Sequence, residues 1–188
     1  EAAGFEVERE YYVNDAGRQM NILAASVWLR YLQQAGEDIV FPSNGYQGAY
    51  VNDIAEQLHA QAGERLKHNA SAVMTDLHAD APEGHKEKHI DDLIERAQNL
   101  LGDADYRLVF DAGLNSIRDD IEQDLHGFGV DFEHWFSERS LDQGDQINRA
   151  ITKLQEQGHV YEDGGALWFR STAFGDDKDR VVKRDNGQ

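Results

Sequence analysis

The chain has 188 residues, of which 40% are hydrophobic and 29% are charged, as in ordinary globular proteins. It contains no run of about 20 apolar residues that would cross a bilayer, and no basic stretch followed by an apolar one that would direct secretion. It also contains no cysteine, which excludes disulfides, thiolate metal sites and thiol nucleophiles and suits a reducing cytoplasm.

Acidic residues outnumber basic ones by 36 to 18, which gives a formal net charge of −18, and most of the excess lies between Asp76 and Asp145. A protein that binds a polyanion must neutralise its phosphates with cations, so this chain should repel RNA at long range. We therefore expect no strong nucleic-acid binding by this segment alone.

The first elements are a strand, a turn and a helix. Residues 5–13 alternate apolar and charged side chains, which predicts a strand, and residues 14–17 supply a turn. An apolar stripe at three- and four-residue spacing then predicts a helix that stops near Gly36. This order is typical of one half of a parallel α/β unit.

The middle of the chain is predicted to be helical. After a loop at residues 41–45, one helix runs from about residue 50 to Gly63, and residues 64–84 are weakly patterned. Two stronger helices follow, over 90–101 and 106–128, and Gly102 allows a short antiparallel connection between them. The stripe of the second helix is expected to be core: Tyr106, Phe110, Leu114, Ile117, Ile121, Leu125 and Phe128.

The last part returns to strands. A helix over 147–154 is stopped at Gly158, and residues 160–162 and 166–170, joined by a turn at 163–165, predict a hairpin. Residues 180–184 predict a further strand, followed by a turn at 185–187. The first strand lacks a predecessor and the last lacks a return strand, so we expect a segment excised from a longer chain.

These elements predict an α/β fold that is mostly helical. We expect residues 1–36 to be a strand–turn–helix piece of a larger fold. Residues 37–128 are expected to form an acidic helical insertion, and residues 129–188 to return to the first fold with a helix and β-strands.

Four collinear stretches resemble the bacterial arginyl-tRNA synthetases. They are the segment Arg9-Glu10-Tyr11-Tyr12-Val13-Asn14-Asp15-Ala16-Gly17-Arg18-Gln19-Met20, the loop Phe41-Pro42-Ser43-Asn44-Gly45-Tyr46-Gln47-Gly48, the segment Trp135-Phe136-Ser137-Glu138-Arg139-Ser140-Leu141, and the strand-and-loop region from Gly165 to Val181. Any one of these stretches is a weak signal, but four in the same order are specific. The resemblance covers nearly the whole chain.

The resemblance implies a Rossmann-type catalytic domain with an inserted helical subdomain. It implies a parent enzyme, an arginine–tRNA ligase of the cytoplasm, that uses Mg²⁺-ATP to form arginyl-adenylate and transfers arginine to tRNA(Arg). The family's two ATP signatures, a His-x-Gly-His helix start and a KMSKS-type loop, do not occur here. We therefore assign no catalytic residue and no metal ligand. We expect the isolated chain to be inactive and to bind neither ATP nor Mg²⁺.

The resemblance points to Glu138 as a residue near the substrate arginine. A carboxylate accepts two N–H bonds from a planar guanidinium, and such pairing is strong and specific. The alternative is that Glu138 caps the next helix or pairs locally with Arg139. This chain has Ser137-Glu138-Arg139-Ser140 where some relatives have Gly-Glu-Ser, so the register differs slightly.

Asn14, Asp15 and Gln19 form a second candidate group for the wall of the arginine pocket. They lie where a strand ends and a helix begins, and α/β folds bind ligands at the carboxyl ends of strands. The alternative is that Asn14 or Asp15 caps the helix while Gln19 faces solvent.

Other patterns favour structural roles. The acidic run from Asp176 to Arg180 has oxygen ligands suited to Mg²⁺, but mixed charges are more typical of a solvated turn. His85 and His89 have a spacing that can bind zinc, yet Lys86 and Lys88 would repel a cation, and we interpret both histidines as surface residues. A rival to the enzymatic interpretation remains: a non-catalytic acidic helical module used for docking.

Overall fold

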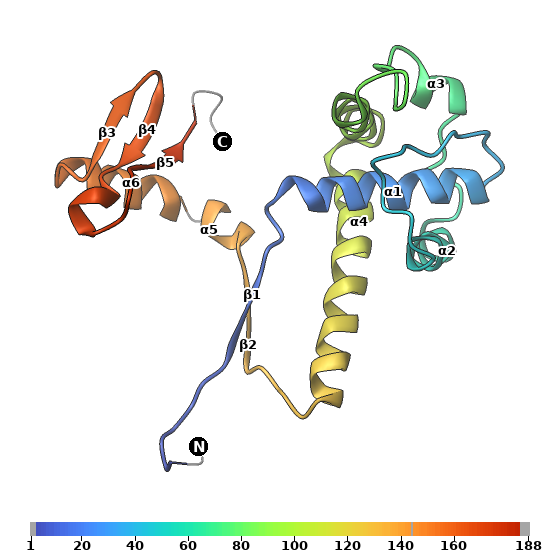
Figure 1. Cartoon of the computed structure of the whole chain (residues 1–188). Helices are drawn as coiled ribbons and strands as arrows, with labels where there is room; N and C mark the ends of the chain where they lie inside the picture. The colour runs from blue at the N-terminus through green and yellow to red at the C-terminus, as the bar shows by residue number, and fades with distance from the viewer. Residues whose placement is uncertain (1–2, 144, 185–188) are drawn as a thin grey trace. The chain divides into compact units, whose positions relative to one another are not determined.

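The computed structural model describes residues 3–143 and 145–184, and it divides into two compact units, Glu1–Trp135 and Phe136–Gln188. Each unit is described by itself (Figure 1). Within the described residues, no helix is both long enough and apolar enough to span a membrane.

Helix α1 (Arg18–Gln34) is the centre of the first unit, where it packs against α2 (Tyr50–Ala62) and α4 (Lys86–Gly127). It is buried almost all round between Ile22 and Leu32, because other helices cover more than one of its faces. The short helix α3 (Ala70–Met74) also packs on α4. The predicted helices over 20–32 and 50–63 are thus confirmed, including the stops beside Gly36 and Gly63.

Two polar aromatic side chains anchor this core. Trp28 is 1% exposed, and its indole Nε1 donates to the Leu66 carbonyl at 2.9 Å. The Tyr31 hydroxyl donates to the Gly63 carbonyl. Since each buried N–H or O–H has an acceptor, the two large rings stabilise the core without an unsatisfied polar group.

Helix α4 is broken at Gly102, where φ is 67° and ψ is 173°. A side chain rarely adopts such a backbone conformation, so glycine is required at this break. The predicted division into two helices is therefore confirmed. In Figure 1 the first half is seen nearly end on and the second half from the side, so the two halves cross steeply and are not antiparallel as we expected.

The apolar stripe of the second half of α4 is core only near its start. Phe110 is 8% exposed, and Leu114 and Ile117 pack partly against the core. Phe128, however, is 86% exposed, so the prediction of a core stripe is wrong at that end. The end of the second half of α4 therefore extends beyond the helices of the first unit that cover its beginning.

Strand β1 (Glu10–Val13) pairs with β2 (His134–Ser137) in a two-stranded sheet. Next to it, the amides of Glu133 and His134 donate to the Arg9 carbonyl at 3.1 and 3.2 Å. The Tyr11 ring stacks on Trp135 with 4.6 Å between centroids. The predicted strand is shorter than expected, because its first residues do not pair and Phe5 is 75% exposed.

The second unit contains α5 (Arg139–Gln143), α6 (Gln146–Glu156), the 3-10 turn η1 (Ser171–Phe174) and three strands, β3 (Val160–Asp163), β4 (Ala166–Phe169) and β5 (Arg180–Lys183). The sheet is antiparallel in the order β3-β4-β5. The predicted hairpin is confirmed, but Asp163 pairs with Ala166, so the turn has two residues, Gly-Gly, and is one residue shorter than predicted. The predicted turn at 185–187 lies outside the described residues.

The predicted fold class is confirmed at the level of an α/β chain that is about half helical and has small sheets. The structure also places α1, which we assigned to the first strand–turn–helix piece, in one core with the helices of the predicted insertion.

Candidate functional site

The junction of β1 and α1 is a tight turn. The Asp15 amide donates to the Val13 carbonyl at 3.0 Å, and the Met20 amide donates to the Gly17 carbonyl at 3.1 Å. Gly17 therefore occupies the N-cap position that we had considered for Asn14 or Asp15. A Cβ at residue 17 would lie 3.3 Å from Asn14 Oδ1, so glycine leaves room for that side chain.

The candidate residues at this junction differ in exposure. Asp15 is only 2% exposed, whereas Asn14 and Gln19 are exposed. A buried carboxylate requires polar partners, so Asp15 is suited to holding the turn together. Asn14 and Gln19 are the members of the group that are accessible to a ligand.

Gln19 lines a polar pocket of about 230 Å³. The pocket is formed by the first turn of α1, the loop 41–48 and the start of α4, and its lining residues are Arg18, Gln19, Ile22, Asn44, Gly45, Tyr46 and Glu87. The Tyr46 hydroxyl donates to Gln19 Oε1 at 3.1 Å. Two stretches that we singled out separately in the sequence therefore meet here.

Asn14 lines a different pocket of about 230 Å³. Its walls are mainly apolar and come from β1, β2 and the second half of α4, including Tyr11, Ile117 and Trp135. The predicted group of Asn14, Asp15 and Gln19 is thus divided between two pockets and a buried position.

The loop 41–48 is held by contacts from several elements. The Tyr46 amide donates to Ser26 Oγ at 2.9 Å, and Ser26 is fully buried in α1. Ser43 donates through its amide and its hydroxyl to the Asp80 carboxylate, at 2.7 and 2.6 Å. A Cβ at Gly45 would lie 2.9 Å from the Phe41 ring, so the loop is also closely packed on itself. These contacts fix the position of Tyr46 before any ligand arrives.

Asp80, which this loop contacts, and Asp92, which His78 contacts, have lowered pKa values. Desolvation acts to raise the pKa of Asp80, but hydrogen bonds from Ser43 and from the Ala81 amide outweigh it and lower the pKa. The same balance holds for Asp92, where desolvation is outweighed by hydrogen bonds from the His78 amide and imidazole.

The cation of the polar pocket is already paired. Arg18 lies 3.0 Å from Glu87 and 2.7 Å from Asp91, measured between guanidinium nitrogen and carboxylate oxygen. These acidic groups offset its charge. The pocket therefore offers neutral hydrogen-bonding groups more than a positive field.

Glu138 lies in the second unit, in the turn between β2 and α5, and its side chain is partly buried. Its backbone carbonyl accepts from the Leu141 amide at 3.0 Å, which is a first-turn contact of α5. The Ser140 hydroxyl donates to the Ser137 carbonyl at 2.6 Å. Two local bonds therefore support the backbone of this turn.

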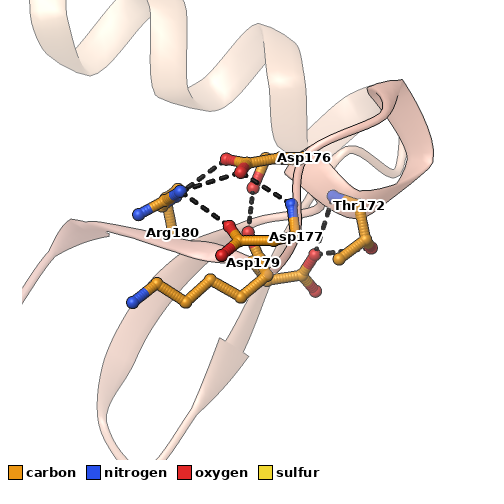
Figure 2. A network of polar contacts seen from close by, with 7 residues as sticks. Thr172, Asp176, Asp177, Asp179 and Arg180 are labelled. Carbon is orange, nitrogen blue, oxygen red and sulfur yellow. Dashed lines mark hydrogen bonds and ion pairs between the residues drawn. The ribbon is translucent and has the colours of Figure 1, made fainter.

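The acidic run after η1 forms a closed network (Figure 2). Arg180 donates to both oxygens of Asp176, at 2.7 and 2.8 Å, and to Asp177 at 2.9 Å. Thr172 donates to Asp179 through its hydroxyl at 2.7 Å and through its amide at 3.2 Å. The bonds from Arg180 hold the pKa of Asp176 far below its usual range. This arrangement is that of a turn stabilised by its own charges.

The histidine prediction is partly wrong. His85 is exposed just before α4, but His89 is only 7% exposed and its Nδ1 lies 2.7 Å from the His78 carbonyl. In the described part of the chain, no group of three or more His, Cys, Asp or Glu residues is arranged to hold a metal ion.

The sequence argument missed Ser26 and the pairing of Tyr46 with Gln19. A serine inside the otherwise apolar run of α1 was the available signal for Ser26, because a polar side chain at a buried position needs a partner. The partner of Gln19 lies 27 residues away, and no local pattern predicts such a contact.

No family model matches the chain. It is 58% identical to an arginine–tRNA ligase of Thioalkalivibrio sulfidiphilus over the whole chain, 56% identical to that of Hydrogenovibrio crunogenus over 98% of the chain, and 54% identical to that of Legionella pneumophila over the whole chain. The chain spans about a third of the length of these curated relatives, 32% in each case.

The fold is similar to that of a solved structure described as an arginyl-tRNA synthetase of Campylobacter jejuni. The TM-score is 0.66 at 26% sequence identity, and the match covers 98% of this chain and 33% of that one.

Proposed function

We infer that this chain is a segment of the arginine–tRNA ligase family, and we propose that the protein containing it activates arginine with ATP and transfers it to tRNA(Arg). The observation that carries the proposal is the identity of 58% with a curated ligase over the full length of the chain. We propose the cytoplasm as its location, and arginine, ATP and tRNA(Arg) as its partners.

In this proposal the chain supplies one wall of the site. Neither ATP signature of the family occurs in it, so binding of Mg²⁺-ATP is assigned to the rest of the protein, where the ion and the nucleotide provide the activated phosphate. Glu138 is proposed to accept two N–H bonds from the substrate guanidinium, since that group has five donors and no acceptor. What supports this role is the chemistry of the carboxylate, which matches the planar guanidinium with two parallel bonds.

We also propose how the segment relates to the whole fold. Residues 1–36 and 129–188 would belong to a Rossmann-type catalytic domain, and residues 37–128 would be an insertion in it. The support is the pairing of β1 with β2, which are neighbours in a sheet although the helical residues separate them in sequence. The shared core around α1 would then hold the insertion rigidly on the β1–α1 junction.

The test is to express the full-length protein that contains this chain and to measure exchange of pyrophosphate into ATP. Exchange that depends on arginine, together with arginylation of tRNA(Arg), is the expected result. Exchange that depends on another amino acid, or no exchange with active control ligase run in parallel, would refute the proposal.

A further inference from the structure

The side-chain amide of Gln19 has a defined orientation. Its Oε1 accepts from the Tyr46 hydroxyl at 3.1 Å, and among the described residues its amide nitrogen donates to no acceptor. An amide has one acceptor oxygen and an NH₂ group with two donors. Tyr46 occupies one lone pair of the oxygen, and the NH₂ group is the part of the Gln19 side chain that makes no hydrogen bond within the described residues.

Tyr46 is itself held by a buried contact. Its amide donates to Ser26 Oγ, and that hydroxyl donates to the Ile22 carbonyl at 2.7 Å inside the fully buried part of α1. Gln19 and Ser26 both lie on α1. Tyr46 is therefore bonded to this helix at two points, through its hydroxyl and through its backbone amide. This arrangement keeps the phenol in place and prevents free rotation of the Gln19 amide.

We propose that Tyr46 is a positioning residue that orients the Gln19 NH₂ group as a hydrogen-bond donor, so that this group recognises an oxygen acceptor of a bound substrate and not a guanidinium. A guanidinium presents donors only, and two donor groups do not bind each other. The proposal rests on the proposed function and concerns the polar pocket of the first unit that Gln19 and Tyr46 line.

The surroundings disfavour a strongly anionic acceptor. Arg18 is offset by Glu87 and Asp91, so the pocket lacks the free cation that a polyphosphate would require. A carboxylate oxygen of the amino acid, whose charge is offset by its own α-amino group, is one such acceptor, and an uncharged hydroxyl oxygen of the nucleotide is another. The Michaelis constants for arginine and ATP separate these two sources.

The experiment compares Tyr46→Phe, Gln19→Glu and the double variant in the full-length protein, by arginine-dependent pyrophosphate exchange. Tyr46→Phe should raise KM by roughly 3- to 10-fold, the loss expected for one neutral hydrogen bond, and leave kcat unchanged. Gln19→Glu, which has no donor, should raise it at least as much. The double variant should match Gln19→Glu, because both changes act through one contact.

The matched control is Tyr106→Phe. The Tyr106 hydroxyl also donates to an amide oxygen on α1, that of Asn21, at 2.9 Å, but Tyr106 does not line the polar pocket. Its variant should keep both Michaelis constants. A rise in the arginine constant for Tyr46→Phe and Gln19→Glu assigns the acceptor to the amino acid, and a rise in the ATP constant assigns it to the nucleotide. Unchanged constants for both substrates, or full binding by Gln19→Glu, would overturn the inference.

A second measurement does not depend on activity. In the 188-residue chain, the NMR signals of the Gln19 side-chain NH₂ should shift and its order parameter should fall in Tyr46→Phe but not in Tyr106→Phe. An unchanged order parameter would overturn the positioning role even where the enzyme is active. The opposite outcome is a lower Gln19 order parameter in Tyr46→Phe together with no pyrophosphate exchange by the full-length protein. That result would support the contact between Tyr46 and Gln19 and would reject the proposed function.

Discussion

Replacement of Ser26 by alanine tests how the loop 41–48 is held. Ser26 is fully buried, donates to the Ile22 carbonyl at 2.7 Å and accepts from the Tyr46 amide at 2.9 Å. The Ile22 carbonyl lies inside α1, so its loss of an extra bond costs little. The Tyr46 amide lies in a loop and has no helical carbonyl as an alternative acceptor. A half-buried donor left unsatisfied costs about 1–3 kcal/mol.

The expected loss of stability in Ser26→Ala is the difference between two opposing effects. Alanine is the better helix former by a few tenths of a kcal/mol, so the net loss expected for Ser26→Ala is about 1–2 kcal/mol. At roughly 2–4 °C per kcal/mol for a chain of this size, the melting temperature of the first unit should fall by about 2–8 °C.

The assay is thermal and urea unfolding of the 188-residue chain, followed by tryptophan fluorescence, since Trp28 is 1% exposed in the same core. Ser140→Ala is the control, because its hydroxyl makes an exposed local bond to the Ser137 carbonyl and its loss should cost little. A Ser26→Ala variant as stable as the wild type would show that the loop does not depend on this bond, and the account of a preorganised Tyr46 would fail.

Three further predictions concern the isolated chain. It should show no arginine-dependent exchange of pyrophosphate into ATP, because positioning of the phosphates needs groups that this chain lacks; exchange above a buffer control would contradict this. It should bind tRNA weakly at about 50 mM salt because of its net charge of −18, and submicromolar affinity in a fluorescence titration would refute the argument. Finally, Asp80 and Asp92 have pKa values lowered below 3.8, so the stability they contribute is present above that pH and is lost as the pH falls below it. The acid unfolding of Asp80→Asn should therefore depend less on pH between about 4 and 2 than that of the wild type.

Elements with local causes were predictable from the sequence. The hairpin of β3 and β4 follows from a two-residue turn between alternating strands, and Gly164 and Gly165 have the positive φ angles, 59° and 80°, that such a turn requires. The break of α4 at Gly102 was likewise predictable, because glycine adopts a positive φ that interrupts a helix at low cost.

Elements set by distant contacts were not predictable. The steep crossing of the two halves of α4 depends on how each packs against α1 and α2, and periodicity carries no such information. His89 was expected on the surface because lysines flank it, yet the neighbouring loop covers it and its imidazole contacts the His78 carbonyl. Phe128 shows the opposite error, since an apolar residue in register with a stripe is buried only where another element reaches it.

The candidate site was predictable only in part. The four collinear stretches indicated Glu138, Asn14, Asp15 and Gln19, and the structure describes the positions of all of them. It does not test their roles. What the sequence lacked was the contact between Gln19 and the loop 41–48, which arises because α1 and that loop fold against each other.

The most direct test of the account is Glu138→Gln in the full-length protein, with Michaelis constants measured for arginine and ATP. If the carboxylate holds the guanidinium, removing its charge costs about 2–5 kcal/mol. The constant for arginine should then rise by roughly 30-fold or more while that for ATP changes little. A helix-capping role would instead lower the melting temperature by the loss of about 1 kcal/mol. An unchanged arginine constant with a lowered melting temperature would contradict the account and assign Glu138 to the structure of the α5 turn.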